Sequence, residues 1–169
     1  MTRRSATGMI FCALLSAMAV SLFCIKSAQA VKQPIQYNHY KHTQTLEIEC
    51  ATCHQGVRDG VRATLPSVEI CMGCHADAVT DSPEEEKIRT FYSKNQEIPW
   101  QRLFKLPPHV FFSHRRHVSV AGLDCTKCHG DMAFRKTPPN KAPMKISMNA
   151  CLSCHRKLQA KTDCVSCHR

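Results

Sequence analysis

The chain has 169 residues and 12 cysteines, and its 23 lysines and arginines outnumber the 13 acidic residues, for a formal net charge of +10. This length is that of a single domain. The sequence has no Ser–His–Asp pattern, phosphate-binding loop or catalytic carboxylate pair, which excludes the enzyme classes that depend on them. The basic excess would by itself favour nucleic acid or a membrane surface as partner.

The N-terminal segment has the pattern of a secretory signal. Its parts are the basic Arg3 and Arg4, the apolar run Met9–Ile25, and the small-residue cleavage site Ala28–Ala30. We expect residues 1–30 to be a signal peptide removed on export, which predicts a periplasmic protein. An uncleaved anchor is the alternative, but the run is shorter than the about 20 residues that a spanning helix needs. No other segment is apolar enough to cross a membrane.

Five copies of Cys-x-x-Cys-His follow, and they contain every cysteine except Cys12 and Cys24 of the signal segment. The pattern is the attachment signature of c-type haem, in which two thiols bind the porphyrin and the histidine is the proximal iron ligand. The predicted attachment cysteines are Cys50, Cys53, Cys71, Cys74, Cys125, Cys128, Cys151, Cys154, Cys164 and Cys167. The predicted proximal ligands are His54, His75, His129, His155 and His168. We therefore predict five covalently attached haem c groups and a function in electron transfer.

Three other uses of the cysteines fit less well. Zinc and iron–sulfur sites use Cys-x-x-Cys pairs, but they do not require a histidine directly after every pair. Export to an oxidising compartment also disfavours both. Disulfides form poorly between two cysteines that are three positions apart, outside redox enzymes.

The remaining histidines match the number of sixth ligands that five haems need. They are His39, His42, His109, His114 and His117. Two axial imidazoles leave no open position on the iron, which suits electron transfer because little rearranges when the charge changes. Thioether ligation raises the reduction potential, so all-histidine ligation predicts low potentials.

The assignment of distal ligands to haems follows from sequence position. His39 is expected to serve the first haem and His114 the third, while His42 and His117 are placed to serve neighbouring haems. His109 has two open assignments, the fifth haem or the second. If His109 is not a ligand, one haem is open or bound by a methionine, for which Met72, Met132, Met144 and Met148 are available. Each of these sulfurs is also suited to packing around a porphyrin.

The chain contains an internal repeat. Tyr37–His42 and Phe112–His117 both read aromatic–polar–His-x-x-His, and the first histidine of each precedes a motif cysteine by 11 residues. Pro66–His75 likewise resembles Pro143–His155. The predicted organisation is a signal peptide at 1–30, a two-haem module at 31–80, a linker at 81–108, and a three-haem module at 109–169.

The fold class predicted from these numbers is mostly irregular, with short α-helices and little or no β structure. The mature chain would have 139 residues for five haems, so the haems must form much of the core. Short helical turns should carry the haem motifs. In the linker, Ser82 and Pro83 predict the start of a helix that runs to about Lys94, with Glu84–Glu86 in solvent. An extended stretch from 96 to 108 follows, where Trp100 packs on a porphyrin or in the core.

The charge changes once the signal peptide and cofactors are included. Loss of Arg3, Arg4 and Lys26 leaves 20 basic and 13 acidic residues, a net charge of +7. Ten propionates and five ferric porphyrin cores bring this to +2, and reduction brings it to −3. The basic composition therefore does not support nucleic acid as a partner. Ligand imidazoles should be oriented by backbone carbonyls or water.

The aromatic-x-His-x-x-His…Cys-x-x-Cys-His arrangement resembles the class III multihaem cytochromes, the cytochrome c3 and c7 group. The block Ile98–His117 (IPWQRLFKLPPHVFFSHRRH) is similar to the pentahaem cytochrome subunit of alternative complex III and related quinone reductase complexes. This resemblance implies electron transfer between a membrane quinone-linked complex, with an iron–sulfur partner, and periplasmic carriers. Those subunits are often membrane-anchored, whereas this signal segment has the pattern of a cleaved one.

The sequence thus favours a periplasmic pentahaem electron carrier, which is not an enzyme. A fixed subunit of a quinol-oxidising or quinone-reducing membrane complex is the first alternative. A small multihaem oxyanion reductase is the second, and it would need a haem with an open or weakly held position, which the histidine count disfavours.

Overall fold

The computed structural model describes residues 30–168. The basic pair, the apolar run and most of the cleavage site of the predicted signal peptide therefore lie outside the described residues. Residues 31–168 form one compact unit. Within the described part, no helix is long and apolar enough to cross a membrane.

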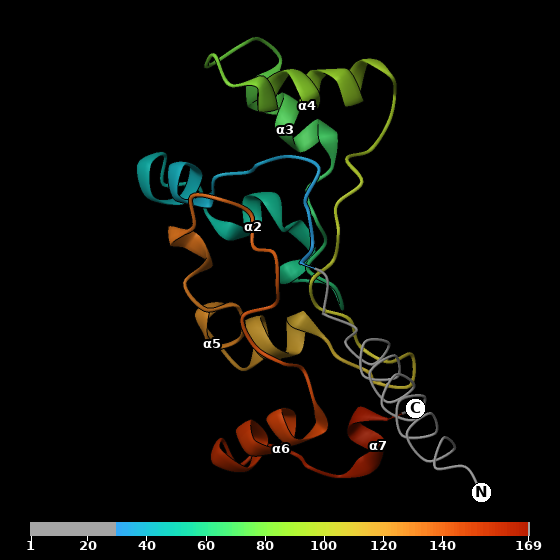
Figure 1. Ribbon diagram of the computed structural model, residues 1–169. Coiled ribbons are helices and arrows are strands. Elements are labelled where there is room, and N and C mark those ends of the chain that lie inside the picture. The colour runs from blue at the N-terminus through green and yellow to red at the C-terminus, as the bar shows by residue number, and fades with distance from the viewer. Residues whose placement is uncertain (1–29, 169) are drawn as a thin grey trace, which may run out of the picture. The chain divides into compact units, whose positions relative to one another are not determined.

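Short helices joined by coil make up the whole described part, as Figure 1 shows. The α-helices are α2 (Cys50–Cys53), α3 (Val68–His75), α4 (Pro83–Ser93), α5 (Thr126–His129), α6 (Met148–Lys157) and α7 (Cys164–Cys167). Between them lie two π-helical turns, η1 (Lys41–Thr45) and η3 (Arg116–Val120), and two 3₁₀ turns, η2 (Gln55–Val57) and η4 (Met132–Phe134). Residues 30–168 contain no strand, only one isolated bridge between Val110 and His168. The predicted fold class is confirmed.

Helix α4 begins and ends where the sequence indicates. The Ser82 hydroxyl accepts a hydrogen bond from the Glu84 N–H at 3.4 Å, and Pro83 occupies the first turn, where its missing N–H costs nothing. The helix ends at Ser93, and the Lys94 N–H donates to the Thr90 carbonyl. Residues 96–108 then run without helix. Both predictions for this segment are confirmed.

The apolar core of the polypeptide lies in the first half of the chain. Ile35, Val68, Ile88 and Ile98 are buried together, and Cys71, Met72, Phe91 and Trp100 pack against them. Helix α3 packs on α4 (Figure 1). Val68 of α3 and Ile88 of α4 both belong to the buried cluster. The Trp100 indole N–H donates to the Pro66 carbonyl at 2.9 Å, so Trp100 packs in the core, one of its two predicted positions.

The second half is packed differently. Ser113 is the only buried residue between 109 and 168, and no apolar side chain there is buried by the polypeptide itself. Because folding depends on burying apolar surface, this half needs another component in its interior. An interior built largely from porphyrins, as predicted, would satisfy that need.

Candidate haem-ligation sites

The five Cys-x-x-Cys-His motifs share one local geometry. In α2, α5 and α7 the backbone N–H of the motif histidine donates to the carbonyl of the first cysteine, at 2.8 to 2.9 Å. This i to i+4 bond places both sulfurs and the imidazole on one side of a single turn. The second and fourth motifs lie within the longer helices α3 and α6. All ten motif cysteines have free thiols and form no disulfide.

Four histidines outside the motifs face a motif histidine. The ring centres of His42 and His75 are 6.2 Å apart, and those of His117 and His155 are 6.1 Å apart. The separation is 6.5 Å between His114 and His129 and 5.5 Å between His109 and His168. Each pair joins segments that are distant in the sequence. Of its two open assignments, His109 lies beside the fifth motif.

His39 is the remaining histidine, and His54 is the remaining motif histidine. Their proximity appears in the electrostatics of the pair. Burial is the largest cause that lowers the pKa of His39, to about 4, and the neighbouring His54 is the next. An imidazole with a low pKa is neutral at physiological pH, and the neutral form is the one that binds a metal.

The ring separations fit an iron between two imidazoles. With a metal–nitrogen bond of about 2 Å on each side, two imidazoles on opposite faces of one metal have ring centres about 6 Å apart. All four pairs lie within half an ångström of that value, with the His109–His168 pair the closest of them. Thiol pairs on the adjacent turns supply the covalent attachment that haem c requires. The residues present therefore fit haem c.

The two His-x-x-His segments have the same structure, as the sequence repeat predicts. Tyr37 stacks on His42 with ring centres 4.5 Å apart and meets His39 edge-on at 4.7 Å. Phe112 stacks on His117 at 4.4 Å and meets His114 edge-on at 4.9 Å. Each segment leads into a π-helical turn, η1 or η3. The aromatic residue at the start of each segment, Tyr37 or Phe112, thus packs against both imidazoles of that segment.

Backbone carbonyls orient half of the ten candidate imidazoles. The Nδ1 atom of His42 lies 2.9 Å from the Asn38 carbonyl oxygen, and that of His117 lies 2.8 Å from the Ser113 oxygen. The corresponding contacts of His54, His114 and His155 are with the carbonyls of Thr64, Val61 and Lys161, at 2.9, 3.2 and 2.5 Å. A carbonyl can only accept, so Nδ1 carries the proton and Nε2 is free to bind metal. The prediction of backbone partners is confirmed for these five.

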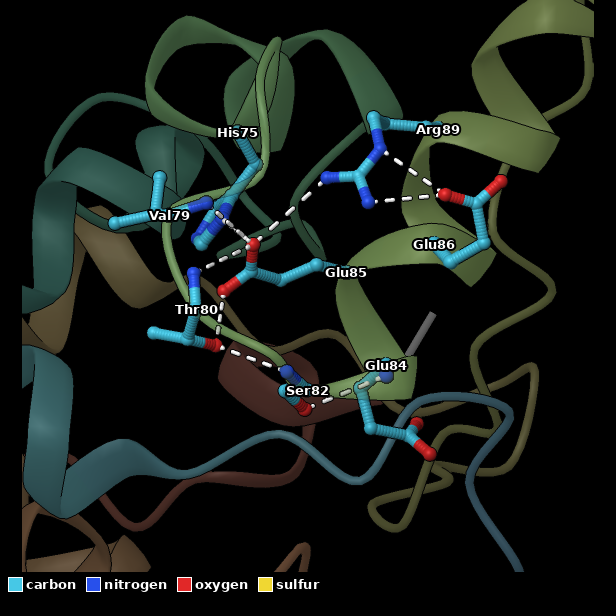
Figure 2. A network of polar contacts seen from close by, with 8 residues as sticks. All are labelled: His75, Val79, Thr80, Ser82, Glu84, Glu85, Glu86 and Arg89. Atoms are coloured by element: carbon cyan, nitrogen blue, oxygen red, sulfur yellow. Dashed lines mark hydrogen bonds and ion pairs between the residues drawn. The ribbon is translucent and has the colours of Figure 1, made fainter.

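His75 departs from this pattern. Its buried Nδ1 makes no hydrogen bond with any described residue, and a carboxylate oxygen of Glu85 lies 3.5 Å away (Figure 2). Glu85 is only 5% exposed. The Thr80 hydroxyl donates to it at 2.6 Å and the Val79 N–H at 2.9 Å. These hydrogen bonds, the Thr80 hydroxyl first, lower the pKa of Glu85 to about 2.

The burial of Glu85 corrects one prediction. The sequence predicts that Glu84–Glu86 form a solvated helix start, and Glu86 is exposed. Glu85, however, precedes the buried Ile88 by three residues and Phe91 by six, so it lies on the inward face of α4. That spacing was visible in the sequence and would have identified Glu85.

Burial also lowers the pKa of two more candidate ligands. For His114 the desolvation of the ring is the largest cause, and the nearby His117 and His54 add to it, against an opposing hydrogen bond with Val61. For His129 the causes are burial and then His114 and His54. The imidazoles of the first and third sites therefore lie close to one another.

Comparison with known families agrees with this geometry. The model of the class III cytochrome c family matches residues 24–102, and the model of cytochrome c7 and related cytochromes c matches residues 110–169. The chain is a c3/c7-like multihaem cytochrome c. Cytochromes of this kind carry covalently bound haem c and transfer electrons. A search of curated proteins gave no match.

Proposed function

We propose that this cytochrome carries five haem c groups, each held between two histidines, and that it transfers electrons in the periplasm. The observation that supports this most strongly is the pairing of histidine rings. Four distal histidines lie 5.5 to 6.5 Å, centre to centre, from four different motif histidines. His39 and His54, the last of each set, lie close enough to interact electrostatically.

The proposed axial pairs follow the order of the motifs. They are His39 with His54, His42 with His75, His114 with His129, His117 with His155, and His109 with His168. In this scheme each His-x-x-His segment serves two haems, the first through one imidazole and the second through the imidazole three residues later. One short segment therefore fixes the spacing of two neighbouring haems.

The haem iron supplies the reversible one-electron change, and the polypeptide sets the conditions under which it occurs. The Nδ1–H groups bound to backbone carbonyls fix the tautomer and the ring orientation, which keeps Nε2 directed at the metal position. Tyr37 and Phe112 restrain the rings by stacking. A haem held by two of these imidazoles would have no open position on its iron, which would favour electron transfer over the binding of a substrate.

Mass spectrometry of the mature protein tests the haem count and attachment. We expect five haem-bearing peptides after proteolysis, one for each Cys-x-x-Cys-His motif. A motif peptide recovered without haem would contradict the proposal for that site.

We further propose that the electron donor or acceptor is a quinone-linked membrane complex with an iron–sulfur subunit, and that other periplasmic redox proteins complete the pathway. The support is the resemblance of Ile98–His117 to the pentahaem subunit of alternative complex III. In the structure this block contributes Ile98 and Trp100 to the core and His109, His114 and His117 to the proposed ligand set.

Cell fractionation separates the two forms of this proposal. A free carrier is released with the periplasmic fraction as a mature chain. A fixed subunit of a quinol-oxidising or quinone-reducing complex stays with the membranes and co-purifies with an iron–sulfur protein. Recovery in the cytoplasm without haem would contradict both.

A further inference from the structure

We propose that Glu85 is a positioning residue that holds the potential of the second haem below the value that a backbone carbonyl partner would give. The inference rests on the proposed ligation of that haem by His75. It concerns one carboxylate on α4, a helix in the segment that the sequence predicts to be a linker.

The placement of Glu85 against His75 is the first observation. The carboxylate oxygen Oε2 lies 3.5 Å from Nδ1 of His75, and that nitrogen is buried without a hydrogen bond to any described residue. No ion pair joins another histidine of residues 30–168 to a carboxylate. Five other candidate ligands donate Nδ1–H to neutral backbone carbonyls. His75 therefore differs from them in the charge of its partner.

The carboxylate is held firmly in its place. Oε1 accepts from the Thr80 hydroxyl at 2.6 Å, and Oε2 accepts from the N–H groups of Val79 and Thr80 at 2.9 and 3.3 Å (Figure 2). A buried acid stays ionised only where such donors replace water. Because these donors come from the loop directly after α3, the carboxylate and His75 are fixed to the same short segment.

Arg89 offsets only part of this charge. Its guanidinium lies 3.7 Å from Oε2 of Glu85 but donates to Glu86 at 2.9 and 3.3 Å. The three side chains together carry a net charge of −1. That charge remains beside the imidazole of His75.

Two physical effects then act in the same direction. An imidazole whose Nδ1–H faces a carboxylate is a stronger donor to its metal than one that faces a carbonyl. A negative charge in a partly desolvated site also stabilises the more positive, oxidised state of a nearby iron. Both lower the reduction potential of the second haem, and second-sphere groups of this kind are a recognised influence on haem potential.

The internal repeat supplies a comparison within the chain. His155 occupies the position in α6 that His75 occupies in α3, and its Nδ1 contacts the Lys161 carbonyl instead. In the second half the chain passes from α6 to α7 within a few residues and has no helix equivalent to α4. A carboxylate therefore lies beside only one of these two equivalent histidines.

Potentiometric titration of the five-haem protein tests the proposal. Glu85→Gln keeps the side-chain shape and can still accept from Thr80, but it removes the charge. We expect the reduction equilibrium constant of one of the five haems to increase about tenfold. For a one-electron couple this is a rise in reduction potential of about 59 mV. The component is assigned to the second haem by its absence from the double variant Cys71→Ala/Cys74→Ala. The g values of one low-spin ferric EPR signal should change with it.

Glu84→Gln is the matched control, because it removes the same charge from the neighbouring position of the same helix, where the carboxylate is paired with Lys87 and not with Arg89. That charge lies outside the group of Glu85, Glu86 and Arg89, so we expect the reduction equilibrium constant of each haem to change by less than about threefold. Equal shifts in the two variants, or a Glu85→Gln protein in which no component moves, would overturn the proposal.

If Glu85→Gln does not mature with five haems, Thr80→Val tests the same role of Glu85. Loss of the hydroxyl leaves the carboxylate with one donor fewer and without any change in formal charge. We expect the same component to move to lower potential, and an unchanged component overturns the inference. A wild-type protein without haem at Cys71 and Cys74 would instead contradict the proposed function itself.

Discussion

The second haem motif of each half is the same sequence feature supported in two different ways. In the first half α3 packs against α4, with Val68 and Ile88 buried between them and a carboxylate beside His75. In the second half α6 has no buried residue, and Nδ1 of His155 lies beside the backbone carbonyl of Lys161 instead of a carboxylate. The comparison indicates that a polypeptide core stabilises one module, whereas the other depends on its cofactors.

The largest effect expected from this difference concerns loss of a haem. The variant Cys151→Ala/Cys154→Ala should lose one haem and leave residues 109–168 open to proteolysis, because no apolar core remains there. The matched variant Cys71→Ala/Cys74→Ala should lose one haem and still protect α3 and α4. Limited proteolysis with a haemochrome assay measures both. Equal protease sensitivity in the two modules would contradict the comparison.

Replacement of a distal ligand should produce the next largest effect. His42→Met and His117→Met change equivalent positions of the repeat, and a thioether ligand raises the potential. We expect one component in each variant to rise by roughly 0.1–0.2 V, a fraction of the about 0.8 V range that axial ligands span. Gln44→Met, an exposed change on the same turn as His42, is the control and should move none. A potentiometric titration in which several components rise would contradict the proposed pairing.

Core truncation should separate the halves in stability. Ile88 is 7% exposed, and Ile88→Ala should destabilise the protein by about 2–5 kcal/mol through lost burial and a residual cavity. Val165→Ala, at a position 75% exposed in the second half, should change stability by less than about 0.5 kcal/mol. Denaturant unfolding followed by far-ultraviolet circular dichroism measures both. Similar values for the two variants would argue against a polypeptide core confined to the first half.

The smallest expected effect concerns helix caps. Ser82 and Ser147 each accept a hydrogen bond from a first-turn N–H, that of Glu84 or Ala150. Ser82→Ala and Ser147→Ala should each cost about 1 kcal/mol, while the threonine variants should keep most of the stability. Thermal unfolding of the four proteins provides the measurement. If the threonine variants lose as much stability as the alanine variants, the capping hydroxyl does not stabilise these helices.

Local features of the fold followed from short-range rules. Ser82 and Pro83 marked the start of α4, and Cys-x-x-Cys-His marked the five motif helices, because capping and i to i+4 spacing act within one turn. The repeat of Tyr37–His42 in Phe112–His117 likewise predicted two segments of equal structure.

Long-range features did not follow in the same way. The contact of His109 with His168, and not with the second motif, depends on how residues 96–110 cross the molecule, and no local rule fixes that path. Glu85 was assigned to solvent because acids at a helix start usually are exposed, but α4 turns that position toward α3. The helical spacing of Glu85 from Ile88 and Phe91 indicates that Glu85 faces inward. At this position that spacing is a better guide to burial than the polarity of the residue.

Spectroscopy of the mature protein with a haemochrome count tests most directly whether every iron lies between two histidines. We expect five covalently bound haems per chain, low-spin signals only, and no binding of carbon monoxide by the reduced native protein. A count below five, a high-spin signal, or carbon monoxide bound to any haem of the native protein would contradict it.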